Sequence, residues 1–154
     1  MKANTKYFGE VEIEDDKILE FPNGIIGFES LRKFAIIYDV EKGENVNVSF
    51  LQSMEEPLLV IPVMNPLVVK EDYNPTVDDE LLKPIGDPSD EDMMVVVSMT
   101  VPADIKKMTV NLKAPFIINT KDRQGAQIIV DNPEYEIRFP IYDILEANKQ
   151  KAGE

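Results

Sequence analysis

The chain has 154 residues and a formal net charge of −13, from 29 acidic and 16 basic residues, and it contains no histidine, cysteine or tryptophan. Without histidine, no side chain titrates near neutral pH unless its pKa is strongly perturbed, and the commonest metal ligand is missing. Without cysteine there is no thiolate nucleophile, thiolate metal site or disulfide. The composition therefore excludes most catalytic classes and favours a binding protein.

The hydrophobic content of 44% is ordinary, so the acidity does not indicate disorder, and the length favours a single folded domain. The polar N-terminus does not resemble a secretion signal, and the longest apolar run, Met93 to Val97, is too short to span a bilayer. We therefore expect a soluble, cytoplasmic protein that does not contact membranes. Its negative field repels nucleic acid and favours basic partners, although the charge is equally well explained by solubility alone.

The first half of the chain predicts short strands separated by polar turns. Residues 6–14 alternate in polarity, and residues 18–21 are expected to return beside them after a turn at residues 15–17. One helical turn is expected at residues 29–33. Further strands are expected at residues 34–39, 46–52, 58–63 and 67–70, with a polar turn at residues 41–45.

The second half continues this pattern, with strands expected at residues 93–101, 109–119, 126–130 and 135–139. Two stretches favour helix. Thr76 is a candidate N-cap for residues 76–82, which Pro84 limits to about two turns, whereas residues 141–151 are expected to form a helix or a frayed tail.

About ten short strands without a βαβ pattern predict an all-β, mainly antiparallel fold with one or two short helices. The architecture is expected to be a small β-barrel or a sandwich. We expect a single domain over residues 1–142, followed by a tail over residues 143–154.

An acid-dense segment at residues 71–92 carries nine acids against one base, Lys83, and is broken by prolines and a glycine. Long excursions from a β scaffold often carry function, although a solvated, self-repelling loop is the simpler interpretation. The acids lack the spacing of a calcium loop, so no metal site is expected. The candidate partner-binding residues in this segment are Asp78, Asp79, Glu80, Asp90, Glu91 and Asp92.

An apolar turn bracketed by Gly24 and Gly27 supplies three further candidate partner-binding residues: Ile25, Ile26 and Phe28. Exposed apolar side chains of this kind mark binding surfaces. We expect Phe28 to point into the core, whereas Ile25 and Ile26 are each compatible with either direction.

No catalytic constellation is expected. Neighbouring carboxylates on a strand point to opposite faces, the serines show no nucleophile-elbow spacing, and phosphate-cradling glycine motifs are missing. The seven methionines, which adapt to irregular surfaces, are expected mainly to fill gaps in the core. We therefore expect a protein that is not an enzyme and needs no cofactor.

Several short segments, taken in their order along the chain, indicate a protein family more specifically than the composition does. They are Thr5-Lys6-Tyr7-Phe8-Gly9-Glu10, Phe21-Pro22-Asn23-Gly24, Gly27-Phe28-Glu29-Ser30-Leu31, Leu51-Gln52-Ser53, Glu56-Pro57-Leu58, Asn65-Pro66, Val110-Asn111-Leu112-Lys113-Ala114-Pro115, Ile118-Asn119 and Arg123-Gln124-Gly125. In this order and spacing, over about residues 5–140, the chain resembles the flagellar assembly factor FliW family.

The resemblance implies a bacterial, cytoplasmic protein with two alternative partners. One is flagellin, held before export, and the other is CsrA, a basic RNA-binding dimer that represses translation of flagellin mRNA. Release of FliW when flagellin is exported would relieve that repression. The motifs that match include Asn111, Pro115 and Asn119, which are interpreted as residues that set turns and hydrogen-bond within the fold. The alternative function is an acidic module that mimics nucleic acid and blocks another basic protein.

Overall fold

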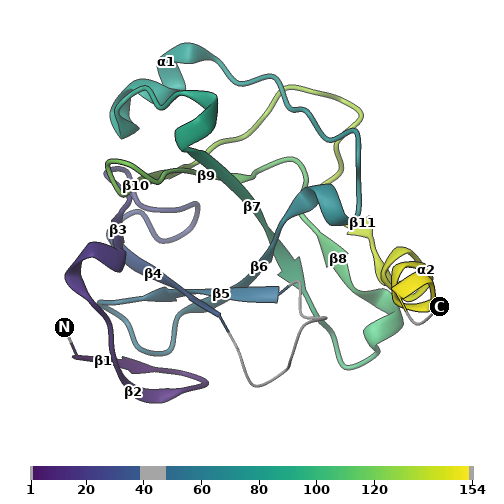
Figure 1. The fold of residues 1–154 in the computed structure, drawn as a ribbon, viewed down its shortest axis with the longest axis horizontal. Helices are drawn as coiled ribbons and strands as arrows, with labels where there is room; N and C mark the ends of the chain where they lie inside the picture. The colour runs from purple at the N-terminus through teal and green to yellow at the C-terminus, as the bar shows by residue number, and fades with distance from the viewer. Residues whose placement is uncertain (1, 39–47, 153–154) are drawn as a thin grey trace.

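The computed structural model describes residues 2–38 and 48–152, and its centre is a closed β-barrel (Figure 1). The barrel strands are, in spatial order, β3 (Ile18–Glu20), β4 (Lys33–Tyr38), β5 (Val48–Ser53), β6 (Val60–Met64), β7 (Met93–Thr100), β9 (Phe116–Asn119) and β10 (Gln124–Gln127). Neighbouring strands are antiparallel except β3 and β10, which pair in parallel through Glu20 and Gln124 and close the ring. The predicted all-β, mainly antiparallel class is confirmed, as a barrel.

Aromatic rings fill the interior of the barrel. Alternation along the strands turns Phe34 inward, where its ring lies 5.2 Å from that of Phe21, which in turn lies 6.3 Å from Phe116. A side chain at Gly125 would place a Cβ 2.6 Å from the Phe21 ring, so a glycine is required opposite this aromatic stack.

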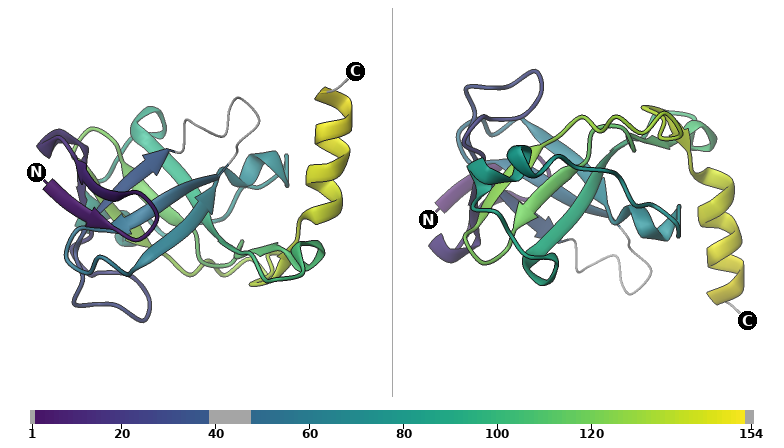
Figure 2. Two further views of the ribbon diagram at one scale, coloured as in Figure 1. Left: turned by 90° about the horizontal axis from the view of Figure 1, so that it is seen from below. Right: turned by 90° about the horizontal axis from the view of Figure 1, so that it is seen from above.

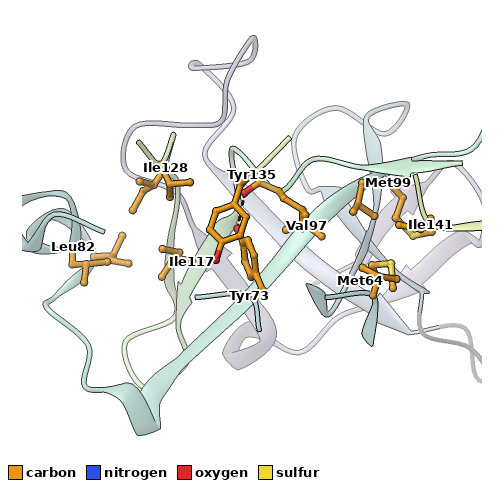
Figure 3. Close-up of a cluster of buried hydrophobic side chains, with 14 residues drawn as sticks. Met64, Tyr73, Leu82, Val97, Met99, Ile117, Ile128, Tyr135 and Ile141 are labelled. Carbon is orange, nitrogen blue, oxygen red and sulfur yellow. Dashed lines mark hydrogen bonds between the residues drawn. The ribbon is translucent and has the colours of Figure 1, made fainter. Parts of the chain in front are cut away.

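A second apolar cluster lies outside the barrel, on the outward faces of β7 and β9 (Figure 3). It is covered by the long connection between β6 and β7, by the two-residue strands β8 (Thr109–Val110) and β11 (Phe139–Pro140), and by helix α2 (Tyr142–Ala152). Ile144 and Leu145 of α2 pack against this cluster, so residues of the predicted tail form a docked helix.

The N-terminus forms a separate hairpin of β1 (Lys2–Thr5) and β2 (Gly9–Glu12) beside the barrel (Figure 2). The predicted strand at residues 18–21 is present as β3, but the prediction that it returns beside a single strand over residues 6–14 is wrong. The Thr5 hydroxyl accepts the Phe8 N–H at 2.9 Å and donates to the Gly9 carbonyl at 2.8 Å, and Gly9 has a φ of +65°. These contacts turn the chain early, which frees β3 to pair with β4 inside the barrel.

Two predicted strands are interrupted by an asparagine side chain that accepts backbone N–H groups two or three residues ahead. Residues 67–70 are not a strand, because the Asn65 side chain accepts the Leu67 N–H at 3.0 Å and starts a 3₁₀ turn at Pro66–Val68. The expected strand at residues 109–119 is split into β8 and β9, because the Asn111 side chain accepts the N–H groups of Lys113 and Ala114. The expected structural role of Asn111 is thus confirmed.

Three other expectations change. Residues 29–33 form no helical turn, and within residues 135–139 only Phe139 is in a strand. Helix α1 (Asp79–Leu82) begins after Asp78 and not after Thr76, whose N–H donates to the Asn132 side chain at 2.8 Å. The expected turn at residues 41–45 and the expected strand ends at residues 39 and 46–47 lie outside the described residues. Among the residues that are described, no helix combines the length and apolarity needed to cross a bilayer.

Candidate partner-binding surfaces

The acid-dense segment at residues 71–92 is fixed to the barrel at its beginning by two tyrosines (Figure 3). The rings of Tyr73 and Tyr135 lie 4.6 Å apart, and the Tyr73 hydroxyl donates to the Leu112 carbonyl at 2.7 Å. The Tyr135 hydroxyl accepts the N–H of Asn74 at 2.8 Å. Burial raises the pKa of the Tyr73 phenol, so this hydroxyl keeps its proton and remains a donor.

The far end of the segment is fixed by the turn between β9 and β10. The Asn119 side chain donates to the Ile85 carbonyl at 2.7 Å, and the Thr120 N–H and hydroxyl both donate to the Asp92 carbonyl, at 2.8 and 3.0 Å. Between these points, Leu82 and Ile85 are buried in the outer apolar cluster. The segment is therefore an ordered part of the fold and not a loose loop, and the expected structural role of Asn119 is confirmed.

The six acidic candidates of this segment form a surface that we call the acid platform: Asp78, Asp79, Glu80, Asp90, Glu91 and Asp92. All are exposed except Asp92, which is half-buried and accepts a hydrogen bond from the Ser89 hydroxyl at 3.1 Å. Among residues 2–38 and 48–148, whose side chains the structure describes, no ion pair involves any of the six; the ion pair found there joins Lys70 and Asp72. The platform is therefore a cluster of acidic side chains without a basic ion-pair partner among these described residues.

The platform lies at the end of the barrel away from helix α2 (Figures 1 and 2). Over the described part of the chain, no three carboxylates converge closely enough to hold a metal ion. A cavity of about 420 Å³ lies beneath the same segment and is lined mainly by apolar side chains, among them Leu67, Tyr73, Val77 and Met93. Charged and apolar surface thus occur next to each other.

The apolar turn places its three candidates differently from the expectation. Ile25 is 2% exposed and packs into the barrel interior, so it cannot offer contact area to a partner. Ile26 and Phe28 are 51% and 45% exposed, so the expectation that Phe28 points inward is wrong. The turn is tight, with the Phe28 N–H donating to the Ile25 carbonyl at 2.9 Å, and it directs Ile25 inward and the two other side chains to solvent.

We call the exposed pair Ile26 and Phe28 the apolar tip, and its backbone is held firmly. The Ile26 N–H donates at 2.9 Å to the side chain of Gln127, which itself donates to the Ala114 carbonyl at 3.2 Å. A Cβ on Gly24, which has a φ of +68°, would lie 2.5 Å from the backbone of Glu29. The backbone of the tip is therefore hydrogen-bonded to the barrel and packed closely at Gly24.

The turn between β5 and β6 is hydrogen-bonded to the end of the loop that carries the apolar tip. One carboxylate oxygen of Glu55 accepts the N–H groups of Arg32 and Lys33, at 2.7 and 2.8 Å. These two hydrogen bonds hold the pKa of Glu55 below its ordinary value. Sequence reasoning missed both Gln127 and Glu55, because each acts on residues far away in the sequence and neither lies in a recognisable motif.

Comparison with known proteins identifies the family to which this chain belongs. The family model described as "FliW protein" matches residues 2–141. The chain belongs to the FliW family. The match covers the barrel, the acid platform and the apolar tip, and it confirms the resemblance found from the sequence segments.

Relatives in the FliW family share most of the chain. The flagellar assembly factor FliW of Lachnospira eligens is 52% identical over 94% of this chain and 97% of its own length. The FliW of Lachnoclostridium phytofermentans is 44% identical over 98% of this chain and 97% of its own. A solved structure titled "Crystal structure of the flagellar assembly factor FliW" is 30% identical, with a TM-score of 0.84 over 92% of this chain and 97% of that one. The barrel is therefore a fold that FliW proteins share.

Proposed function

We propose that this FliW-family protein is a non-enzymatic, cytoplasmic factor in flagellum assembly. In this proposal it binds the translational repressor CsrA, relieves repression of flagellin mRNA, and alternatively binds flagellin. Relatives of nearly full length are described as flagellar assembly factors, which supports the assembly role. The two partners come from the resemblance to the family. The observation that carries the proposal is the acid platform, an ordered acidic surface that no ion pair among the described side chains neutralises.

The charge of the platform suits a basic, RNA-binding partner. A protein that binds RNA presents lysine and arginine to phosphates, so opposite fields accelerate its encounter with this chain. The same carboxylates would repel the phosphates of RNA near the complex. Release of RNA therefore needs no complete overlap between the RNA site and the FliW site.

The apolar tip supplies the contact area that a charged surface lacks. Ile26 and Phe28 stand on a backbone that is already fixed by Gly24 and Gln127, so binding orders little additional chain. Exposed apolar residues on a rigid loop are typical of surfaces where a few side chains carry most of the binding energy. In this proposal the acid platform sets the rate at which CsrA associates, and the apolar tip sets the lifetime of the complex with CsrA.

The first experiment is a calorimetric titration of this protein with CsrA, repeated with flagellin already bound. Binding of CsrA that disappears in the presence of flagellin supports the partner switch. Binding that flagellin leaves unchanged refutes the switch and keeps the CsrA interaction. Absence of binding to both partners refutes the proposal and favours an acidic module that blocks another basic protein.

A variant with Asp78→Asn, Asp79→Asn and Glu80→Gln tests the platform by stopped-flow association with CsrA. A pair of charges 10 Å apart in water contributes about 0.4 kcal/mol before screening, so losing three should slow association about twofold to fivefold. The rate should also depend less on salt. The control variant, Glu136→Gln with Asp143→Asn and Glu146→Gln, changes the net charge equally near α2. Equal slowing by both variants would contradict a role for the platform.

A further inference from the structure

A groove with a volume of about 780 Å³ lies beside the N-terminal hairpin. Its floor is apolar and includes Ile36 and Ile37 of β4, Met94 of β7 and Ile118 of β9. Tyr38, which is 62% exposed, stands at its edge. Neither the acid platform nor the apolar tip contributes to the lining, so the groove is a separate surface.

The hairpin borders the groove with β2 and not with β1. Phe8, Val11 and the residues that follow β2 line the groove, whereas no residue of Lys2–Thr5 does so. Within residues 2–38 and 48–152, β2 pairs with β1 alone. Because the backbone groups of an antiparallel strand alternate between its two edges, alternate residues of Gly9–Val11 turn their N–H and C=O groups toward the outer edge of β2, directly beside an apolar groove.

The side chains on the two faces of β2 indicate what kind of peptide would fit as an added strand. Val11 is half-buried and lines the groove, whereas Glu10 next to it is exposed and points to the opposite face. Residues paired across neighbouring strands lie on the same face, within about 5.5 Å of each other. A strand added to β2 would therefore place apolar side chains opposite Val11 and basic side chains opposite Glu10.

The charge of the groove's border favours the same occupant and disfavours a second copy of this chain. The groove is lined by three acidic residues, Glu12, Glu14 and Asp16, against two basic ones, Lys17 and Arg123, and Glu10 of β2 adds a further negative charge nearby. Pairing of two β2 edges would bring like charges of both copies together, which destabilises a sheet. A strand that alternates basic and apolar residues avoids this repulsion and fills the groove.

We propose that the groove beside β2 binds an extended peptide segment with alternating basic and apolar residues, which adds to β2 as a third strand. The segment's apolar side chains lie beside Val11 and Ile37, which pack against the same small apolar cluster, and its basic side chains lie beside Glu10. This site is distinct from the acid platform and the apolar tip, and its test depends on neither CsrA nor flagellin.

The test uses the synthetic peptide Lys-Val-Lys-Ile-Lys-Val, capped at both ends and labelled with fluorescein, and a peptide of the same composition ordered Lys-Lys-Lys-Val-Ile-Val. Fluorescence anisotropy with the full chain should show the alternating peptide binding at least about tenfold more tightly, because only it satisfies both faces of β2. Amide hydrogen exchange measured by NMR should show new protection at Gly9, Glu10 or Val11 when the alternating peptide is bound.

Glu10→Lys should weaken binding of the alternating peptide about threefold to tenfold, by turning a cross-strand attraction into a repulsion. Glu136→Lys makes the same change of charge far from the groove and serves as the control. Equal affinity for the two peptides, no binding of either, or binding without protection in residues 9–11 would each overturn the proposal. Equal weakening by the two charge reversals would overturn the pairing with Glu10.

Discussion

Asn119 joins the acid-dense segment to the barrel, and its replacement by alanine tests how firmly that segment is held. The side chain is 2% exposed and makes four hydrogen bonds. Its amide donates to the Ile85 carbonyl at 2.7 Å and to the Asp122 carboxylate at 3.2 Å. Its oxygen accepts the N–H groups of Lys121 and Asp122, both at 3.1 Å.

The cost of Asn119→Ala follows from what each partner loses. The Ile85 carbonyl remains buried without its donor, which costs about 1–3 kcal/mol. The two turn N–H groups belong to exposed residues and regain water, so each loss costs about 0.5–1 kcal/mol. The free energy of unfolding should therefore fall by about 2–5 kcal/mol, and the melting temperature by roughly 4–20 °C for a chain of this size.

Urea unfolding followed by circular dichroism measures this change, with Asn65→Ala as the matched control. Asn65 also caps a turn with its side chain, through the Leu67 N–H, but it is exposed, so its loss should cost about 1 kcal/mol. The slope of the unfolding free energy against urea concentration should be the same in both variants as in the unchanged protein. If the two variants differ by less than about 0.5 kcal/mol, the reasoning from burial is refuted.

Two further predictions concern the loop that carries the apolar tip. Gly24→Ala should destabilise the protein clearly more than Gly27→Ala, because both glycines have positive φ but only a Cβ at position 24 meets backbone, 2.5 Å away; equal unfolding free energies would contradict this account. Glu55→Gln should lower stability at neutral pH and lose its effect as pH falls below the ordinary pKa of 4.5, because the lowered pKa of Glu55 stabilises the fold only while the carboxylate is charged. Unfolding curves between pH 3 and pH 7 measure this, and a destabilisation that is constant over the range would refute it.

The sequence predicted the fold class because strand periodicity is local. Alternation identified β4, β5, β6 and β7 to within a few residues, and residues 141–151, expected as a helix or a frayed tail, contain most of α2. Errors arose where one side chain caps the backbone. Asn65 and Asn111 each accept N–H groups two or three residues ahead, and such a cap stops a strand that periodicity alone would continue.

The candidate surfaces were predicted less completely than the fold. The acidic residues could be listed from charge density, but their ordered placement depends on Tyr135 and Asn119, which lie far along the chain. The direction of Phe28 was predicted wrongly, because hydrophobicity does not indicate which residue of a tight turn enters the core. The groove beside β2 could not be predicted, since it depends on the early turn at Gly9.

The parallel pair of β3 and β10 has a consequence for synthesis of the chain. The ring closes only when Gln124 reaches Glu20, so residues separated by about two thirds of the sequence must meet. Phe21 and Phe34 are made early but acquire their covering partner, Phe116, only late in translation. A nascent chain on the ribosome therefore exposes these rings for most of its elongation, and barrel formation must wait until synthesis is nearly complete.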